Sequence, residues 1–101
     1  MIRHIAMFKF LPAAGGRTKE ENVAITREML EALPAVIPQI KAQTVALNAP
    51  GADEKNCDLV LVADFESLED LEIYRVHPRH VAVGEFMGPV RESRSCVDFE
   101  L

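Results

Sequence analysis

A chain of 101 residues with 49% hydrophobic and 27% charged residues has the size and composition of one globular domain, not of a disordered segment. Its formal net charge of −5 argues against a nucleic-acid partner or an anionic membrane surface, because phosphate groups are bound by basic surfaces. No stretch reaches the roughly 20 apolar residues of a membrane span, and residues 1–5 lead into a strand-like pattern instead of a signal peptide, so we expect a cytoplasmic protein.

The chain has two cysteines, Cys57 and Cys96. They lack the density of a disulfide framework and the close pairing of a zinc or redox motif. Free cysteine is among the most buried residue types, so we expect both side chains to be buried and apolar in character.

The first half of the chain predicts a strand, a helix and a second strand. Residues 2–10 alternate with a period of two and carry apolar side chains on both sides, which predicts a strand covered on both faces. Proline and glycine residues follow, and Thr18 with Glu21 then fits a capping box at the start of a helix. Apolar residues at helical spacing extend that helix over about 18–33. Residues 40–48 predict a second strand of mixed polarity, before a turn-rich loop.

The second half predicts a strand, an interrupted helix and a last strand. Residues 57–65 predict the third strand, in which residues 59–63 are apolar on both faces. Ser67 is a favourable N-cap for a short helix, which Pro78 interrupts, because the residue before a proline is disfavoured in the helical region. We therefore expect His77 to be a junction and Pro78 the first residue of a new helix that extends toward residue 86 or 90. Residues 93–101 predict the fourth strand.

The predicted order is β-α-β-β-α-β, which is typical of the α+β ferredoxin-like arrangement, a four-stranded antiparallel sheet with helices on one face. We expect residues 1–101 to form a single domain of this kind. Since the first and third strands are apolar on both sides, the sheet face without helices needs a cover, and an identical subunit stacked sheet to sheet supplies it. The pattern therefore predicts a homodimer through the sheet faces, a dimeric α/β barrel.

The strongest chemical signal is the segment from Tyr74 to His80, which holds the one tyrosine and two of the three histidines. A succession at i and i+3 turns such side chains toward a shared side. His80 falls near the third position of the new helix, where the helix dipole favours a neutral ring that can act as a general base. Tyr74 can then donate a hydrogen bond to a carbonyl or a developing oxyanion. His4 shares its strand face with Phe8 and would add a polar group to an apolar cavity.

Each of these residues also has a purely structural interpretation. His77 can cap a helix, Tyr74 can pack through its ring, and His4 can be a hydrogen-bonded core residue. A metal site built from the histidines with Glu85 or Asp98 is a competing use, but the spacing matches no zinc signature. We expect no metal and no cofactor.

Four segments carry a resemblance to a known family: His4–Phe10, Ile37–Ile40, Asp64–Leu68 and, most specifically, Tyr74–Val81. On these residues, the chain resembles the stress-responsive A/B barrel domain family of the dimeric α/β-barrel superfamily. The resemblance spans nearly the whole chain. It implies a ferredoxin-like subunit, a homodimer closed through its sheets, and a pocket between sheet and helices.

The resemblance also implies roles for single residues. A plant polyketide cyclase of the family performs a cofactor-free aldol condensation with a histidine base and a tyrosine, which match His80 and Tyr74. Its pocket histidine on the first strand matches His4. The other residues that we expect to bind a substrate are Phe8, Leu30, Leu61, Arg75 and Arg94. The two arginines replace apolar positions of that cyclase, so a guanidinium that points inward favours a smaller, anionic substrate.

These residues and the resemblance support two functions. In the first, the chain is a cofactor-independent cyclase, lyase or isomerase that acts on a small carbonyl or anionic ligand, with His80 as the base that removes a proton next to a carbonyl and Tyr74 as the residue that stabilises the enolate. In the second, it is a non-catalytic dimer, stress-associated or ligand-binding, in which the same residues only pack and cap. A monooxygenase of the same superfamily is a third interpretation, disfavoured by the absence of tryptophan.

Overall fold

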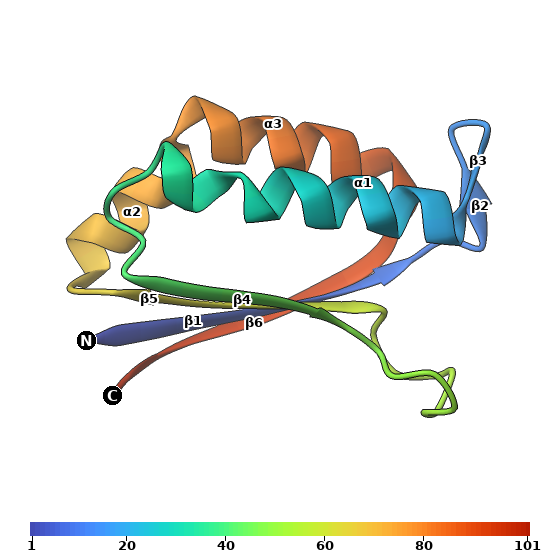
Figure 1. The fold of residues 1–101 in the computed structure, drawn as a ribbon, viewed down its shortest axis with the longest axis horizontal. Coiled ribbons are helices and arrows are strands. Elements are labelled where there is room, and N and C mark those ends of the chain that lie inside the picture. The colour runs from blue at the N-terminus through green and yellow to red at the C-terminus, as the bar shows by residue number, and fades with distance from the viewer.

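The helices of the protein lie on one face of a four-stranded antiparallel sheet, and the other face is uncovered (Figure 1). The structure is a computed structural model that describes residues 1–101. The strands follow the order β4-β5-β1-β6 across the sheet, so the predicted α+β arrangement is confirmed. In chain order the elements are β1 (Ile2–Phe10), β2 (Ala13–Ala14), β3 (Arg17–Thr18), α1 (Lys19–Glu31), η1 (Leu33–Ala35), β4 (Ala42–Leu47), β5 (Leu59–Phe65), α2 (Leu68–Val76), α3 (Pro78–Met87), η2 (Gly88–Val90) and β6 (Arg91–Glu100).

Strand β1 is central and separates the two faces of the sheet by its alternation. His4, Ala6 and Phe8 are buried on the side of the helices, whereas Met7 on the other side is 41% exposed. Its neighbour β5 contributes Phe65, which is fully buried in the same apolar core. Because successive strand residues point to opposite faces, the register of β1 decides which of its side chains can meet the helices.

Helix α1 begins with the predicted capping box. The Thr18 hydroxyl accepts a hydrogen bond from the Glu21 backbone N–H at 3.1 Å, and the Glu21 carboxylate accepts one from the Thr18 N–H at 2.9 Å. The helix ends at Glu31, earlier than residue 33, because the chain then tightens into the short turn η1 that contains Pro34.

We expect the substitution Thr18→Ala to lower the free energy of unfolding by about 1 kcal/mol, because the Glu21 N–H loses its acceptor. Urea unfolding followed by circular dichroism measures the change. The variant Thr18→Ser keeps a hydroxyl at the N-cap and should stay close to the wild type. Equal stability of all three proteins would contradict this role of Thr18.

The segment with proline and glycine residues after the first strand forms a small hairpin, β2 and β3. Gly15 and Gly16 form its turn with φ angles of 62° and 76°, a region that favours glycine. Asn22 is buried beneath the hairpin, where its side chain accepts a hydrogen bond from Arg17 and donates one to the Ala14 carbonyl. The hairpin is therefore attached to the first turn of α1 by these hydrogen bonds.

The break between α2 and α3 lies at His77 and Pro78, as predicted. Ser67 caps α2 through its hydroxyl, which accepts a hydrogen bond from the Asp70 N–H. His77 has an extended backbone, with ψ of 135°, and its Nδ1 accepts a hydrogen bond from the Arg79 N–H. Pro78 is the first residue of α3. His77 is thus the N-cap of α3, and its ring is used for capping.

Two sequence predictions about side-chain burial and strand limits need correction. Cys96 is exposed and Cys57 is only half-buried, so the prediction of two buried cysteines is wrong. Cys96 lies on β6, an edge strand whose residues are largely exposed. The strands β4 and β5 are also shorter than predicted, because the loop between them has its own turns and hydrogen bonds.

The uncovered face of the sheet carries exposed apolar side chains. Val97 lies opposite Ile5 in the register of β6 and β1, and Met7, Val97 and Phe99 are 41%, 54% and 39% exposed. Monomeric proteins rarely leave a contiguous apolar surface of this kind in contact with water. No helix is both long enough and apolar enough to span a membrane.

Candidate functional site

A cavity of about 700 Å³ lies between the helix-facing side of β1 and β6 and the helices α2 and α3. Its apolar lining comes from the helices, through Leu68, Leu71 and Val81. Its polar lining includes His4, Tyr74 and His80, the three residues whose chemistry the sequence pattern singled out. The fold thus brings one residue from β1, one from α2 and one from α3 to a single concave surface, which is the usual form of a small-molecule site.

Tyr74 lies at the centre of this group. Its ring centroid is 4.3 Å from that of His80, 6.2 Å from that of His4 and 5.0 Å from that of Phe65. The side chain is 1% exposed, yet its hydroxyl has no hydrogen-bond partner. A buried polar group without a partner costs about 1–3 kcal/mol, so this hydroxyl is a group that a ligand oxygen can satisfy.

Burial raises the pKa of Tyr74 well above its ordinary value of 10.0, against a smaller opposing effect of the positive charge of Arg94. The phenol therefore stays protonated near neutral pH and acts as a hydrogen-bond donor. A raised pKa also means that the folded state disfavours the phenolate, so this contribution to stability is lost as the pH rises above 10.

This shift can be measured directly, because Tyr74 is the only tyrosine and the chain has no tryptophan. We expect an alkaline titration of the phenolate absorbance of the folded protein to have its midpoint above pH 10. The same protein in concentrated denaturant should titrate near pH 10, and Tyr74→Phe should show no transition. A midpoint near 10 in the folded protein would contradict the burial of this hydroxyl.

His80 is the third residue of α3 and has a defined tautomer. Its Nδ1 lies 3.0 Å from the Arg75 carbonyl oxygen. A carbonyl oxygen can only accept, so Nδ1 carries the hydrogen and the lone pair of the neutral ring is on Nε2. Burial lowers the pKa of His80, and the nearby positive charges of Arg94 and Arg75 and the His4 ring lower it further, while the Arg75 hydrogen bond opposes them. The ring is therefore a neutral base near pH 7.

His4 is buried on β1 and is oriented by Asp98 on β6. The two residues are direct partners in the strand register, and the Asp98 carboxylate accepts a short hydrogen bond from His4 Nδ1. As in His80, this assigns the free lone pair to Nε2 when the ring is neutral. From the sequence, Asp98 was expected only as a competing metal ligand. Its pairing with His4 was missed, because the two residues are adjacent only once the register of β1 and β6 is known.

Three arginines also line the cavity, and they differ in their partners. Arg75 makes two hydrogen bonds of 2.8 Å to the carboxylate of Glu72 on the same helix. The side chains of Arg91 and Arg94 on β6 make no hydrogen bond or ion pair. Arg94 was predicted to bind substrate, and it lies in the cavity, whereas Arg91 was missed.

Three of the predicted substrate-binding residues lie elsewhere. Phe8, Leu30 and Leu61 are at most 4% exposed and belong to the apolar core, away from the cavity lining. The expectation that they line the pocket is not met, because helix α1 packs on the sheet against β4 and β1 and leaves the cavity near α2, α3 and β6. Nor do the histidines gather with Glu85: no group of three or more histidine, cysteine, aspartate or glutamate residues is placed to hold a metal ion.

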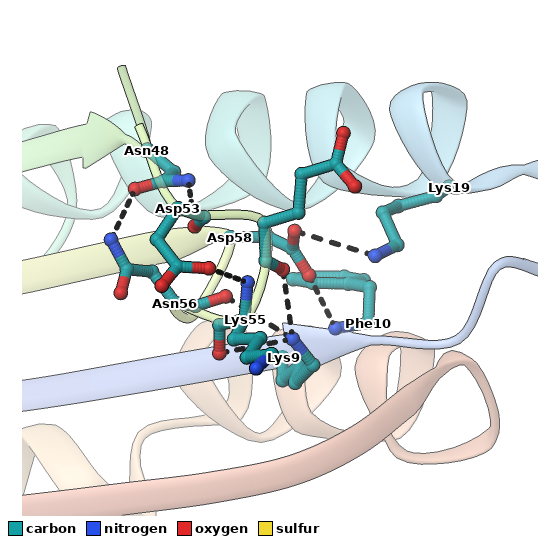
Figure 2. Close-up of polar contacts among 9 residues, drawn as sticks. Lys9, Phe10, Lys19, Asn48, Asp53, Lys55, Asn56 and Asp58 are labelled. Atoms are coloured by element: carbon teal, nitrogen blue, oxygen red, sulfur yellow. Dashed lines mark hydrogen bonds and ion pairs between the residues drawn. The ribbon is translucent and has the colours of Figure 1, made fainter. Parts of the chain in front are cut away.

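A larger hollow, of about 870 Å³, lies between α1 and the end of β4, and no histidine lines it. Some of its polar groups have partners (Figure 2): the Asp58 carboxylate accepts a hydrogen bond from the Phe10 N–H and pairs with Lys19. Lys9, on β1 like Phe10, donates to three backbone carbonyls of residues 54–56. These contacts hold the loop between β4 and β5 in place, and we assign them a structural role.

The model of the stress responsive A/B barrel domain family matches residues 2–101. The chain belongs to this family. Among solved structures, this A/B barrel domain is similar to a dimeric protein of unknown function and ferredoxin-like fold from Bacteroides fragilis, with 34% identity, a TM-score of 0.82, and coverage of 99% of this chain and 95% of the other.

Two further structures share the fold of this A/B barrel domain. A dimeric ferredoxin-like protein of unknown function from Thermobifida fusca is 30% identical, with a TM-score of 0.85 and coverage of 99% and 90%. A hydroxynitrile lyase from Passiflora edulis is 13% identical, with a TM-score of 0.79 and coverage of 99% and 92%, and at this identity the likeness shows the fold alone. None of the curated proteins matches the chain. The ferredoxin-like class predicted from the sequence is thereby confirmed.

Proposed function

We propose that this A/B barrel domain is a cofactor-independent enzyme that removes a proton from a carbon next to a carbonyl group, in the manner of a lyase, cyclase or isomerase. The observation that carries the proposal is that two rings lie 4.3 Å apart in one cavity: that of the neutral His80, and that of the buried Tyr74, whose hydroxyl has no hydrogen-bond partner. A base with a free lone pair and a hydrogen-bond donor are the two groups that enolate formation needs.

The two residues have separate roles. His80 Nε2 takes the proton as the C–H bond breaks, and the electron pair of that bond moves through the new C=C bond to the carbonyl oxygen. Tyr74 donates its hydroxyl hydrogen bond to that oxygen, where negative charge develops. Return of the proton to another carbon isomerises the substrate, and attack of the enolate on a second carbonyl forms a carbon–carbon bond. His4, oriented by Asp98, supplies a further polar group beside Tyr74.

The fold is compatible with such chemistry, since the neighbour from Passiflora edulis is described as a hydroxynitrile lyase. The related structures from Bacteroides fragilis and Thermobifida fusca are described as dimeric. The exposed apolar residues Met7, Val97 and Phe99 favour the same assembly here. The proposed enzyme is therefore a homodimer in which the uncovered sheet faces of two copies pack on each other.

The proposal is tested by deuterium exchange. Phenylpyruvate and phenylacetone each carry CH₂ hydrogens between a phenyl ring and a carbonyl, and proton NMR in D₂O follows the loss of this signal. The enzyme should accelerate exchange in at least one of the two compounds above the buffer rate. Exchange at the buffer rate in both would overturn the assignment of a catalytic base and leave the non-catalytic dimer as the better interpretation.

A further inference from the structure

We propose that the substrate of this site carries a carboxylate, which Arg94 binds with Arg91 beside it, so that the carbonyl group of the same molecule reaches Tyr74 and His80. This inference rests on the proposed function and names its substrate class: small carbonyl compounds with an anionic end, such as keto acids.

The position of Arg94 follows from the strand register. It is the direct partner of Phe8 across β1 and β6, and Cys96 and Asp98 are the partners of Ala6 and His4. Since directly paired residues point to the same face, Arg94 shares the helix-facing side with His4 and lines the same cavity. Its charge is close enough to lower the pKa of both Tyr74 and His80, which agrees with this placement.

Some charged side chains of the cavity have a hydrogen-bond or ion-pair partner in the protein, and others have none. Both carboxylates of the lining have partners, Glu72 with Arg75 and Asp98 with His4. Two guanidinium groups, Arg91 and Arg94, have none. In a chain with a net charge of −5, the cavity thus carries three arginines against two carboxylates. An anionic ligand supplies the missing partner.

A carboxylate fits the two guanidinium groups better than a neutral acceptor does. A guanidinium presents paired N–H donors that match the two oxygens of a carboxylate, and such charge-assisted hydrogen bonds are about twice as strong as neutral ones. His80 does not supply the positive charge near pH 7, because its pKa is lowered. The apolar lining from Leu68 and Leu71 receives the hydrocarbon part of the ligand.

The test compares two ligands of nearly equal shape, 3-phenylpropanoate and 3-phenylpropanamide, by calorimetry at neutral pH. We expect the wild type to bind the carboxylate about tenfold more tightly than the amide, as one charge-assisted pair provides. Arg94→Gln should bring the two affinities together. Arg27→Gln removes the same charge from an exposed ion pair with Glu31 on α1 and should keep the preference.

Thiol labelling shows independently whether the ligand binds in this cavity. Cys96 lines the cavity and Cys57 does not, so bound 3-phenylpropanoate should slow alkylation of Cys96 and leave Cys57 unaffected. Equal affinity for the two ligands in the wild type, or an unchanged preference in Arg94→Gln, would overturn the carboxylate assignment. If the wild type prefers the carboxylate but neither compound exchanges faster than in buffer, the catalytic proposal alone is overturned. If phenylacetone exchanges faster than in buffer but the wild type does not prefer the carboxylate, only the present inference is overturned.

Discussion

The substitution His80→Gln is expected to reduce enzyme-catalysed deuterium exchange by about 10²–10⁴-fold, the range that a positioned general base contributes. Glutamine keeps a side chain of similar length that can donate toward the Arg75 carbonyl, now reached by Nδ1 of His80 at 3.0 Å. It has no basic nitrogen, so the proton acceptor is lost. NMR exchange rates, taken with circular dichroism to verify folding, measure the effect.

The chain provides a matched control three residues earlier. His77 caps α3 through its ring and does not line the cavity. His77→Asn keeps a residue that caps helices well, so this variant should exchange at the wild-type rate. If His80→Gln exchanges as fast as the wild type and instead melts at a lower temperature, His80 is a structural residue and the protein is a non-catalytic dimer.

The pH dependence of exchange should have a definite sign. His80 must be neutral to accept a proton, so activity is lost as the pH falls through its pKa, which lies below the ordinary value of 6.5. The charged and titratable groups around the His80 ring are Tyr74, His4, Arg94 and the guanidinium of Arg75, whose backbone carbonyl also accepts the His80 hydrogen bond. The unfolded state takes up this proton more readily, so the stability contribution of His80 is also lost as the pH falls below 6.5.

The substitution Val97→Asp is expected to convert the dimer to a monomer. Val97 lies on the uncovered sheet face, opposite Ile5, and two-fold symmetry places two such carboxylates in one interface. Leaving one unpaired charge buried costs about 3–5 kcal/mol, which weakens association by a factor on the order of 10² to 10⁴. Sedimentation velocity across a concentration series measures the change.

Val76 is the control for this experiment. In the single subunit Val97 and Val76 are almost equally exposed, at 54% and 56%, but Val76 lies on α2, in the helix layer. From exposure in the single subunit alone, aspartate should be tolerated equally well at both positions. Only the proposed interface, which would bury Val97 and not Val76, predicts a difference between them. Val76→Asp should remain dimeric. A wild-type protein that sediments as a monomer, or a Val97→Asp variant that stays dimeric, would contradict the proposed interface.

The order of the elements and several of their boundaries could be predicted from the sequence, because they depend on neighbours in the chain. The capping box of Thr18 and Glu21 and the N-cap at Ser67 involve residues three positions apart. The break at His77 and Pro78 follows from the covalent geometry of proline. The prediction that Tyr74 and His80 lie close together also depends on neighbours in the chain, since the two residues belong to adjoining helices of one short segment.

The remaining parts of the site depend on contacts between distant segments. Asp98 orients His4 across 94 positions of sequence, and Arg94 enters the cavity through the register of β6 with β1. Leu30 and Leu61 are as apolar as any pocket residue, but Leu30 on α1 and Leu61 on β5 are both buried in the core between helix and sheet. Local patterns specify which face of a strand or helix is apolar. They do not specify which part of that face a helix covers and which part stays open to a ligand, because strand pairing and helix packing set this over the whole fold.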